Sequence, residues 1–271
     1  MAVTTKVVSI GDNCVDHYLP PIDCRFIGGN ALNVAVQLCK SGIRTAYVGN
    51  VGEDREGKLT LEKLHEQGVD ISHVQVHPGR TSTTDVLLTP GGDRQFIHEF
   101  VGPLKTLNLK PETLNFVCQH DLVHNSWMGG TEEYLLLFKQ ARLVASFDYG
   151  ERYTQDYLDR TIAMVDVAFF STTEEEGQRA REFAEEIGHR GPSLVVITMG
   201  RWGSLAYDGS HHFQPAFPAQ VVDTLGAGDT FIGVFLAHRM KKEPVVDSLR
   251  FAAQAAAHTC THYGAWEGSA I

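Results

Sequence analysis

The amino-acid sequence predicts an α/β protein in which a mainly parallel sheet carries helices on both faces. From about residue 111 onward, short apolar runs alternate with segments whose apolar residues have helical spacing. Repeated strand–helix units of this length place the strands parallel, because each helix carries the chain back along one face of the sheet. A β-branched run from Lys6 to Ile10 predicts the first strand, and a 43% hydrophobic composition supplies a sizeable core. We expect a single domain over residues 1–271.

The individual elements follow from the period of the apolar residues, which is two in strands and near 3.6 in helices. A turn rich in glycine, Pro90-Gly-Gly-Asp93, predicts that the strands on either side of it form a hairpin. We expect strands at 45–48, 83–88, 94–98, 121–124, 143–147, 165–170, 194–197 and 204–207, and helices at 30–39, 57–67, 132–139, 155–163, 173–187, directly after 229, and at 245–261.

Composition excludes several classes of function. The formal net charge is -10 and the chain has no cluster of Lys and Arg, so we expect no nucleic-acid partner. No apolar run approaches the roughly 18 residues of a membrane span. The first residues lack a secretory hydrophobic region, and the five cysteines are scattered and odd in number. We therefore expect a cytoplasmic protein with reduced thiols and no membrane contact.

The most informative segment is Asp223-Thr-Leu-Gly-Ala-Gly-Asp229, which leads directly into the apolar helix. Gly226 and Gly228 allow a ligand to approach the backbone, and the amide groups at a helix start attract an anion. A bound phosphate would repel the Asp229 carboxylate, so a carboxylate at this position calls for an explanation. One explanation is that it removes a proton from a hydroxyl as a phosphoryl group arrives. The alternative is that Asp229 only favours the helix dipole.

A second group of polar residues lies near the amino terminus. Asp12 follows the first strand, at the end of a sheet where ligands bind in α/β proteins. Asn30 and Asn33 follow Gly28-Gly29 and share one face of the next helix. Side-chain amides both donate and accept hydrogen bonds, which suits a polyhydroxy ligand. The alternative for Asn30 is an N-cap, which leaves Asn33 unexplained.

Other strands and the hairpin carry further candidates. Asp148 follows the strand at 143–147, and Glu174 follows the strand at 165–170. A carboxylate such as Glu174 near a phosphate site suits Mg²⁺ bound through water, although it also fits an acidic first turn of a helix. Arg94 and Glu99 reach a ligand if the hairpin covers the site; otherwise they are solvated charges on a strand.

Three other patterns do not support a site. Residues 52–59 match a P-loop except that Leu59 replaces the hydroxyl residue that binds magnesium, so we expect a strand-to-helix loop. His258 and His262 share a helix face, but the sequence lacks the Glu of HExxH and shows no third ligand nearby, so we expect no zinc. The segment after the first strand lacks GxGxxG, which excludes a Rossmann dehydrogenase.

Three motifs occur in series: Gly28-Gly29-Asn30 with Asn33, Thr198-x-Gly200-x-x-Gly203, and Asp223 to Asp229. In this order the chain resembles the ribokinase, or PfkB, family of carbohydrate kinases along almost its whole length. The resemblance implies a three-layer α/β/α sandwich with a small β-sheet lid, formed here by about 12–27 and 82–99. It also implies transfer of the γ-phosphoryl group from ATP with Mg²⁺ to a sugar hydroxyl.

The resemblance further implies roles for particular residues. Asp229 is the general base, and Gly226, Ala227 and Gly228 form the anion hole. Sugar-binding positions are Asp12, Gly28, Gly29, Asn30 and Asn33, with Arg94 and Glu99 from the lid. Nucleotide-binding positions are Thr198, Gly200 and Gly203, and Glu174 binds Mg²⁺ through water. Asp223 with Thr224 contributes to a monovalent-cation loop, which binds K⁺ in some members. Two positions depart from the family pattern, because Ser171 and Gln254 stand where asparagine is usual.

The two ends of the chain, Ile10 to Asp16 and His262 to Trp266, resemble the fructoselysine 6-kinase branch of this family. A fructosamine substrate carries the charge of an amino acid, so acidic lid residues such as Asp16 or Glu99 have a role to play. The alternatives are a kinase of fructose, ribose or a 2-keto-3-deoxy acid, and a non-catalytic sugar sensor. Because lid sheets in this family often pair between subunits, we also expect a homodimer through the lid.

Overall fold

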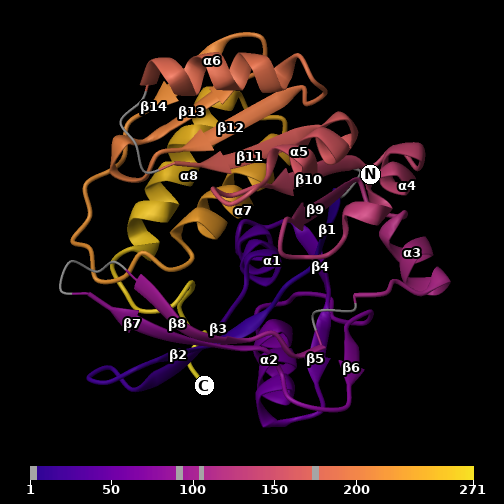
Figure 1. Cartoon of the computed structure of the whole chain (residues 1–271), viewed down its shortest axis with the longest axis vertical. Coiled ribbons are helices and arrows are strands. Elements are labelled where there is room, and N and C mark those ends of the chain that lie inside the picture. The colour runs from indigo at the N-terminus through magenta and orange to yellow at the C-terminus, as the bar shows by residue number, and fades with distance from the viewer. Residues whose placement is uncertain (1–4, 90–93, 104–106, 173–176) are drawn as a thin grey trace.

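The computed structural model describes residues 5–89, 94–103, 107–172 and 177–271, and its main feature is an eight-stranded sheet (Figure 1). The strand order is β14-β13-β12-β11-β10-β9-β1-β4, and every pair from β12 to β4 is parallel. The strands are β1 (Lys6–Ile10), β4 (Arg44–Val48), β9 (Leu122–Ser126), β10 (Val144–Asp148), β11 (Val167–Ser171), β12 (Leu194–Thr198), β13 (Ser204–Tyr207) and β14 (His211–Gln214). Only β13 and β14 are antiparallel to their neighbours.

Helices cover both faces of this sheet, as the alternation of strands and helices predicted. One face packs against α1 (Asn30–Lys40), α7 (Ala227–Met240) and α8 (Val245–Thr259). The other packs against α3 (Pro111–Val117), α4 (Leu135–Gln140), α5 (Gln155–Thr161) and α6 (Gly177–Gly188). Three short 3₁₀ turns, η2 (Glu132–Tyr134), η3 (Ile162–Met164) and η4 (Gly200–Trp202), complete the connections of this part of the chain.

The two cores arise because successive strand residues point to opposite faces. Val7 packs with the α7 and α8 side, whereas Val8 packs with the α3 to α6 side. Phe169 and Phe170 divide in the same way, and all four side chains are buried. Residues buried on both faces give the nearly continuous apolar runs that made these strands recognisable in the sequence.

A four-stranded sheet, which we call the lid sheet, has the order β3-β2-β7-β8. Its strands are β2 (Cys14–Tyr18), β3 (Cys24–Gly28), β7 (Thr83–Leu88) and β8 (Arg94–Phe100), and Figure 1 shows it lying apart from the large sheet. The two antiparallel pairs, β2 with β3 and β7 with β8, are joined by a parallel pair, β2 with β7. This composition matches the lid expected from 12–27 and 82–99, while the turn at 90–93 lies outside the described residues.

The remaining elements are a two-stranded sheet of β5 (Asn50–Gly52) with β6 (Gln75–His77) and the helix α2 (Arg55–Glu66). The Asp54 carboxylate caps α2 by accepting from the backbone N–H of Gly57, and it also accepts from the N–H and the hydroxyl of Thr81. The Asp54 carboxylate therefore accepts the Gly57 N–H that a P-loop would offer to phosphate, and the segment 52–59 runs from the end of β5 through residues 53–54 into α2, as a strand-to-helix connection. No helix within the described segments is long and apolar enough to cross a membrane.

Candidate active site

The candidate site lies where the carboxyl ends of β1, β9 and β10 meet the first turns of α1 and α7. Parallel strands end at the same edge of a sheet, so residues far apart in sequence are brought together there. Asp12 follows β1, Ser126 ends β9 and Asp148 ends β10. Their side chains are buried, and the strand ends are in register, with Asp148 beside Ser126.

Two asparagine amides converge on the carboxylate of Asp229 in the first turn of α7. The Nδ2 group of Asn30 donates to Asp229 Oδ1 at 2.9 Å, and that of Asn33 donates to Asp229 Oδ2 at 2.7 Å. The same Asn30 nitrogen also donates to Asp148 Oδ2 at 2.7 Å. The sequence predicted that Asn30, Asn33 and Asp229 belong to one site, and the structure brings them into direct contact.

Two further side chains fix the orientation of these amides. The indole N–H of Trp266, which can only donate, lies 3.2 Å from Asn33 Oδ1. His124 Nε2 lies 3.4 Å from Asn30 Oδ1, and its Nδ1 lies 3.0 Å from the Ser146 hydroxyl. Because an amide oxygen only accepts, Nε2 carries the proton, and burial lowers the His124 pKa to about 3, which keeps the ring neutral. Both amide N–H groups are thereby directed at carboxylates.

Asp12 makes hydrogen bonds within the protein, in addition to the sugar contact that was predicted for it. Its carboxylate accepts from the backbone N–H groups of Asn30 at 2.7 Å and Ala31 at 3.3 Å, and from the Ser126 hydroxyl at 2.9 Å. Asp12 therefore caps the start of α1 from another part of the chain, a role that the N-cap residue Gly29 has no side chain to fill. Its predicted contact with a sugar stays a prediction.

The glycines in the two motifs allow close packing. A Cβ at position 28 would lie 2.2 Å from Asp16 Oδ2, and one at Gly29, where φ is +107°, would lie 2.4 Å from the Cα of Asn13. At Gly226, with φ +75°, a Cβ would lie 2.2 Å from that of Ala265. Gly228 differs, because no atom of the described residues lies within 4 Å of its Cβ position. Protein packing therefore does not explain that glycine, whereas a ligand approaching the start of α7 would.

The start of α7 has the properties of an anion site. The first amide N–H groups of a helix lack intrahelical partners, and the N-cap residue, Gly226, has no side chain to accept from them. The Ala227 N–H donates to the carbonyl oxygen of Thr224 at 3.3 Å. From the lid, Arg94 Nη1 donates to the carbonyl oxygen of Thr224 at 3.0 Å, which places a guanidinium beside this loop. Asp223 is fully buried and accepts from the backbone N–H groups of Leu225 and Gly264 and from the Tyr18 hydroxyl.

The carboxylates of this site repel one another and are removed from water. Burial raises the pKa of Asp229 and of Asp12, while the Asn33 hydrogen bond opposes the shift at Asp229. Burial raises the pKa of Asp148 to about 7, with a further contribution from the charge of Asp229. Asp16, on β2 of the lid sheet, also has its pKa raised to about 7 by burial, although Cys14 and Arg94 favour its charged form.

The predicted nucleotide positions form a separate group at the ends of β11 and β12. Ser171 and Thr198 are in register, and their hydroxyl groups lie 2.9 Å apart. Gly200 has φ +53° with open space at its Cβ position, whereas Gly203 packs against Gln214 and Pro215. Gln254 is exposed on α8, and Glu99 is exposed on β8. Glu174, the predicted magnesium residue, lies outside the described residues.

Two residues of the site, His124 and Trp266, which orient the amides, were not among the candidates; Asp148 was a candidate, although its contact with Asn30 was not predicted. Asp148 had a visible signal, since it follows a strand just as Asp12 does. His124 is inside a strand and Trp266 is in an irregular segment, so neither has a local pattern that links it to an asparagine far away in sequence.

The raised pKa of Asp16 predicts a pH-dependent stability. Because the carboxyl group has a pKa of about 7 when folded and 3.8 as its ordinary value, the folded state binds more protons between these values. Its contribution is therefore fully present below about pH 4 and is lost as the pH rises to about 7. We expect Asp16→Asn to be more stable than the wild type at pH 8 by several degrees in Tm, and nearly equal to it at pH 4.

Thermal denaturation of both proteins at pH 4, 6 and 8 measures this difference in Tm, with the exposed Asp156→Asn as a matched control. Parallel pH profiles for the wild type and Asp16→Asn would contradict the burial of a carboxyl group at this position.

Comparison with known proteins agrees with this geometry. The model of the pfkB family carbohydrate kinases matches residues 24–270. The chain is 34% identical over 261 residues to the fructoselysine 6-kinase of Escherichia coli, which covers 96% of this chain and 99% of that protein. It is 34% identical over 266 residues to the fructosamine kinase FrlD of Bacillus subtilis, covering 96% and 93%.

Among solved structures, the fold is similar to that of Arabidopsis thaliana ribokinase complexed with ribose and ATP. The TM-score is 0.83 at 25% identity, and the match covers 97% of this chain and 94% of the ribokinase. The expected ribokinase-like architecture is thus confirmed. The family model and the relatives together identify the chain as a phosphotransferase, a member of the PfkB family of carbohydrate kinases.

Proposed function

We propose that this enzyme transfers the γ-phosphoryl group of ATP to a hydroxyl of a fructosamine, with Asp229 as the general base. The observation that carries the proposal is the pair of amide N–H groups that bind the Asp229 carboxylate at the open start of α7. Donated hydrogen bonds favour the ionised carboxylate, which is the form that can accept a proton. A group held in this way is poised to accept the hydroxyl proton of a bound sugar.

In the proposed reaction the sugar hydroxyl donates to Asp229 while its oxygen attacks the γ-phosphorus. The bond from the γ-phosphorus to the bridging oxygen breaks, and ADP leaves. Phosphoryl transfer requires mainly positioning and charge stabilisation. The amide groups of Gly226, Ala227 and Gly228 would stabilise the charge on the phosphoryl oxygens, and Arg94 adds a positive charge from the lid. Mg²⁺ bound with ATP would neutralise part of the phosphate charge.

The surroundings of Asp229 favour a substrate that carries positive charge. Asp16 and Asp148 have pKa values raised to about 7, and each is destabilised by the charge of Asp229. A secondary ammonium group, as in a fructosamine, would relieve this repulsion, whereas neutral fructose or ribose supplies hydroxyl groups alone. A keto-deoxy acid would add another negative charge. The names of the two relatives at 34% identity support the same substrate class.

The lid sheet carries a second acidic side chain, Glu99, which lies at some distance from Asp16. Asp16 pairs in register with Thr84, and Thr84 pairs with Glu99. Residues in register on adjacent strands lie on the same face, so Asp16 and Glu99 share a face and are separated by two strand spacings, roughly 10 Å. We propose that Asp16 contacts the sugar end of the substrate and that Glu99 attracts the distal ammonium of a lysine adduct.

Replacing Asp229 tests the general base. We expect Asp229→Asn to lower kcat by about 10²–10⁴-fold, because the amide cannot accept the hydroxyl proton. ATP binding and Tm should stay close to wild type, since the side chain keeps its shape. Stopped-time assays of ADP formation measure kcat, and Asp208→Asn on an exposed turn is the control. Turnover of Asp229→Asn near that of the wild type would exclude Asp229 as the base.

A substrate panel tests the substrate class and separates the enzyme from a sugar sensor. We expect the highest kcat/KM with fructoselysine, and values at least about tenfold lower with fructose, ribose and 2-keto-3-deoxygluconate. Glu99→Gln should raise the KM for fructoselysine about two- to fivefold without changing that for fructose, since an exposed charge pair contributes at most about 1 kcal/mol. Glu62→Gln on α2 is the control. Equal use of fructose and fructoselysine would refute the fructosamine assignment, and sugar binding without ADP formation would indicate a sensor.

We also propose a homodimer formed through the lid sheet, with a second copy of this chain as the partner. The edge strand β8 is exposed along its whole length, and it presents Phe96, Ile97 and Phe100 to solvent. Unpaired sheet edges with apolar side chains favour pairing with another chain. We expect a dimer in sedimentation velocity and a monomer for Ile97→Lys, with the exposed Leu136→Lys on α4 as the control. A monomeric wild type would refute the dimer.

Asp223 was predicted to contribute to a monovalent-cation loop. Its buried carboxylate already accepts hydrogen bonds from the backbone N–H groups of Leu225 and Gly264 and from the Tyr18 hydroxyl. We therefore base no step of the reaction on K⁺, and a cation site at this loop stays a proposal.

A further inference from the structure

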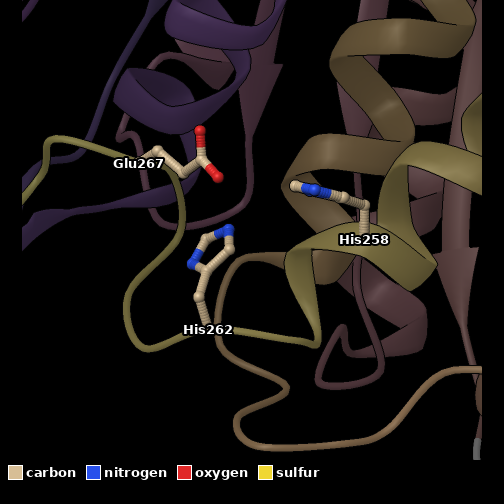
Figure 2. Close-up of side chains that lie close together, drawn as sticks. All are labelled: His258, His262 and Glu267. Atoms are coloured by element: carbon tan, nitrogen blue, oxygen red, sulfur yellow. The ribbon is translucent and has the colours of Figure 1, made fainter.

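Three side chains outside the candidate active site form a cluster of the kind that binds a transition metal. His258 lies near the end of α8, and His262 and Glu267 lie in the irregular segment that follows it. Figure 2 shows the three side chains extending from these positions toward a common point. One ligand atom from each, an imidazole nitrogen or a carboxylate oxygen, lies within 4.8 Å of the others. The sequence argument against a metal overlooked Glu267, which supplies the third ligand.

The protonation of His262 suits metal binding. Its Nδ1 atom lies 3.1 Å from the backbone carbonyl oxygen of Tyr263. A carbonyl oxygen only accepts, so Nδ1 carries the proton and Nε2 keeps its lone pair. Histidines that bind metals commonly donate their other ring N–H to a carbonyl in this way, which fixes the tautomer and the ring orientation. This bond is an observation independent of the clustering.

The ligand set selects the class of ion. Two imidazoles and a carboxylate suit Zn²⁺ and other late first-row ions, whereas Mg²⁺ prefers oxygen ligands and retains its water. In a tetrahedral zinc site, bond lengths of about 2.0–2.1 Å place the ligand atoms about 3.3 Å apart. Closing from 4.8 Å requires small rotations of side chains, and His258 and Glu267 are exposed and able to make them. Water would complete the coordination.

The position of the cluster determines what a bound ion would do. Residues between His262 and Glu267 contact the candidate active site and the loop that precedes α7. The backbone N–H of Gly264 donates to Asp223, Ala265 packs against Gly226, and Trp266 donates to Asn33. An ion that joins His258 on α8 to Glu267 would brace this segment against the helix.

We propose that His258, His262 and Glu267 bind one Zn²⁺ ion, which clamps the segment 260–267 to the end of α8. The site is separate from the magnesium expected with ATP, and it does not depend on the identity of the sugar. Its effect is to stabilise the segment that supports the Asp223–Asp229 loop.

Isothermal titration of the nucleotide-free protein with ZnCl₂ tests the proposal. We expect one equivalent to bind, a rise in Tm of several degrees, and slower amide exchange over 260–267, including Gly264. His258→Ala and Glu267→Gln should each weaken binding by at least about tenfold, since even outer-sphere partners of a metal contribute about 10–100-fold. The exposed His65→Ala on α2 is the matched control, and it should bind like the wild type.

Cobalt provides a second readout that does not depend on stability. Bound Co²⁺ should show the visible absorption of a low-coordinate site with nitrogen and oxygen ligands, and Glu267→Gln should lose it while keeping the wild-type fold and the kinase activity measured with Mg²⁺ and ATP in the absence of Zn²⁺ and Co²⁺. Absence of Zn²⁺ binding to the wild type would overturn the proposal. Unchanged binding by the triple variant His258→Ala, His262→Ala, Glu267→Gln would overturn it as well, because the ion would then bind elsewhere, for example at a cysteine.

Discussion

The hydrogen bonds from Asn30 and Asn33 to Asp229 are the contacts on which the rest of the site depends. They join the first turn of α1 to the first turn of α7, two helices on the same face of the large sheet. Asn30 extends the connection to Asp148 on β10 and to His124 on β9. An unpaired buried charge would be costly, whereas a carboxylate that accepts two amide hydrogen bonds is tolerated. The two amide bonds thus favour the ionised form of Asp229 at the start of α7, whereas burial and the charge of Asp12 oppose it and leave its pKa raised.

This arrangement buries carboxyl groups at the candidate site, which is unfavourable for the stability of the fold. Several carboxylates, among them Asp12, Asp16 and Asp148, are buried within one region, and burial raises the pKa of each. Hydrogen bonds offset part of the free-energy cost of burying Asp12, which caps α1, and of burying Asp223, which accepts from Leu225 and Gly264. The cost of burying Asp16 is offset less, since its described hydrogen-bond partner is the weak thiol donor of Cys14. A poorly compensated carboxyl group at a candidate site is a candidate contact for the substrate, and this is the physical basis on which we propose a cationic sugar derivative.

Much of the fold was predictable because its strands are buried on both faces. The run Leu194 to Ile197 is continuous and apolar, and Val7 to Ile10 is interrupted by Ser9 alone, so their type and position were clear before the structure. The parallel pairing of β2 with β7, which joins the two hairpins into one lid sheet, was not predictable, because strands far apart in sequence leave no local sign of their pairing. The predicted Gly226 to Asp229 motif lies at the start of α7 as expected.

The site was predictable where a residue ends a strand or starts a helix, as Asp12, Asn30 and Asp229 do. Residues that act from inside an element or from an irregular segment were missed. His124 looks like a core residue of β9, and Trp266 and Glu267 depend on how the chain folds after α8. His124 and Trp266 act through hydrogen bonds over long sequence separations: His124 is 94 positions from Asn30, and Trp266 is 233 positions from Asn33.

The central claim is that amide donors keep Asp229 ionised, and the pH dependence of kcat/KM for the wild type and for Asn33→Leu tests it most directly. Leucine has a similar size but cannot donate, so the pKa of Asp229 should rise in the variant. We predict that the acidic limb of the profile moves to higher pH by about one unit or more, with activity partly recovered at high pH. An acidic limb that stays at the wild-type position would contradict the claim.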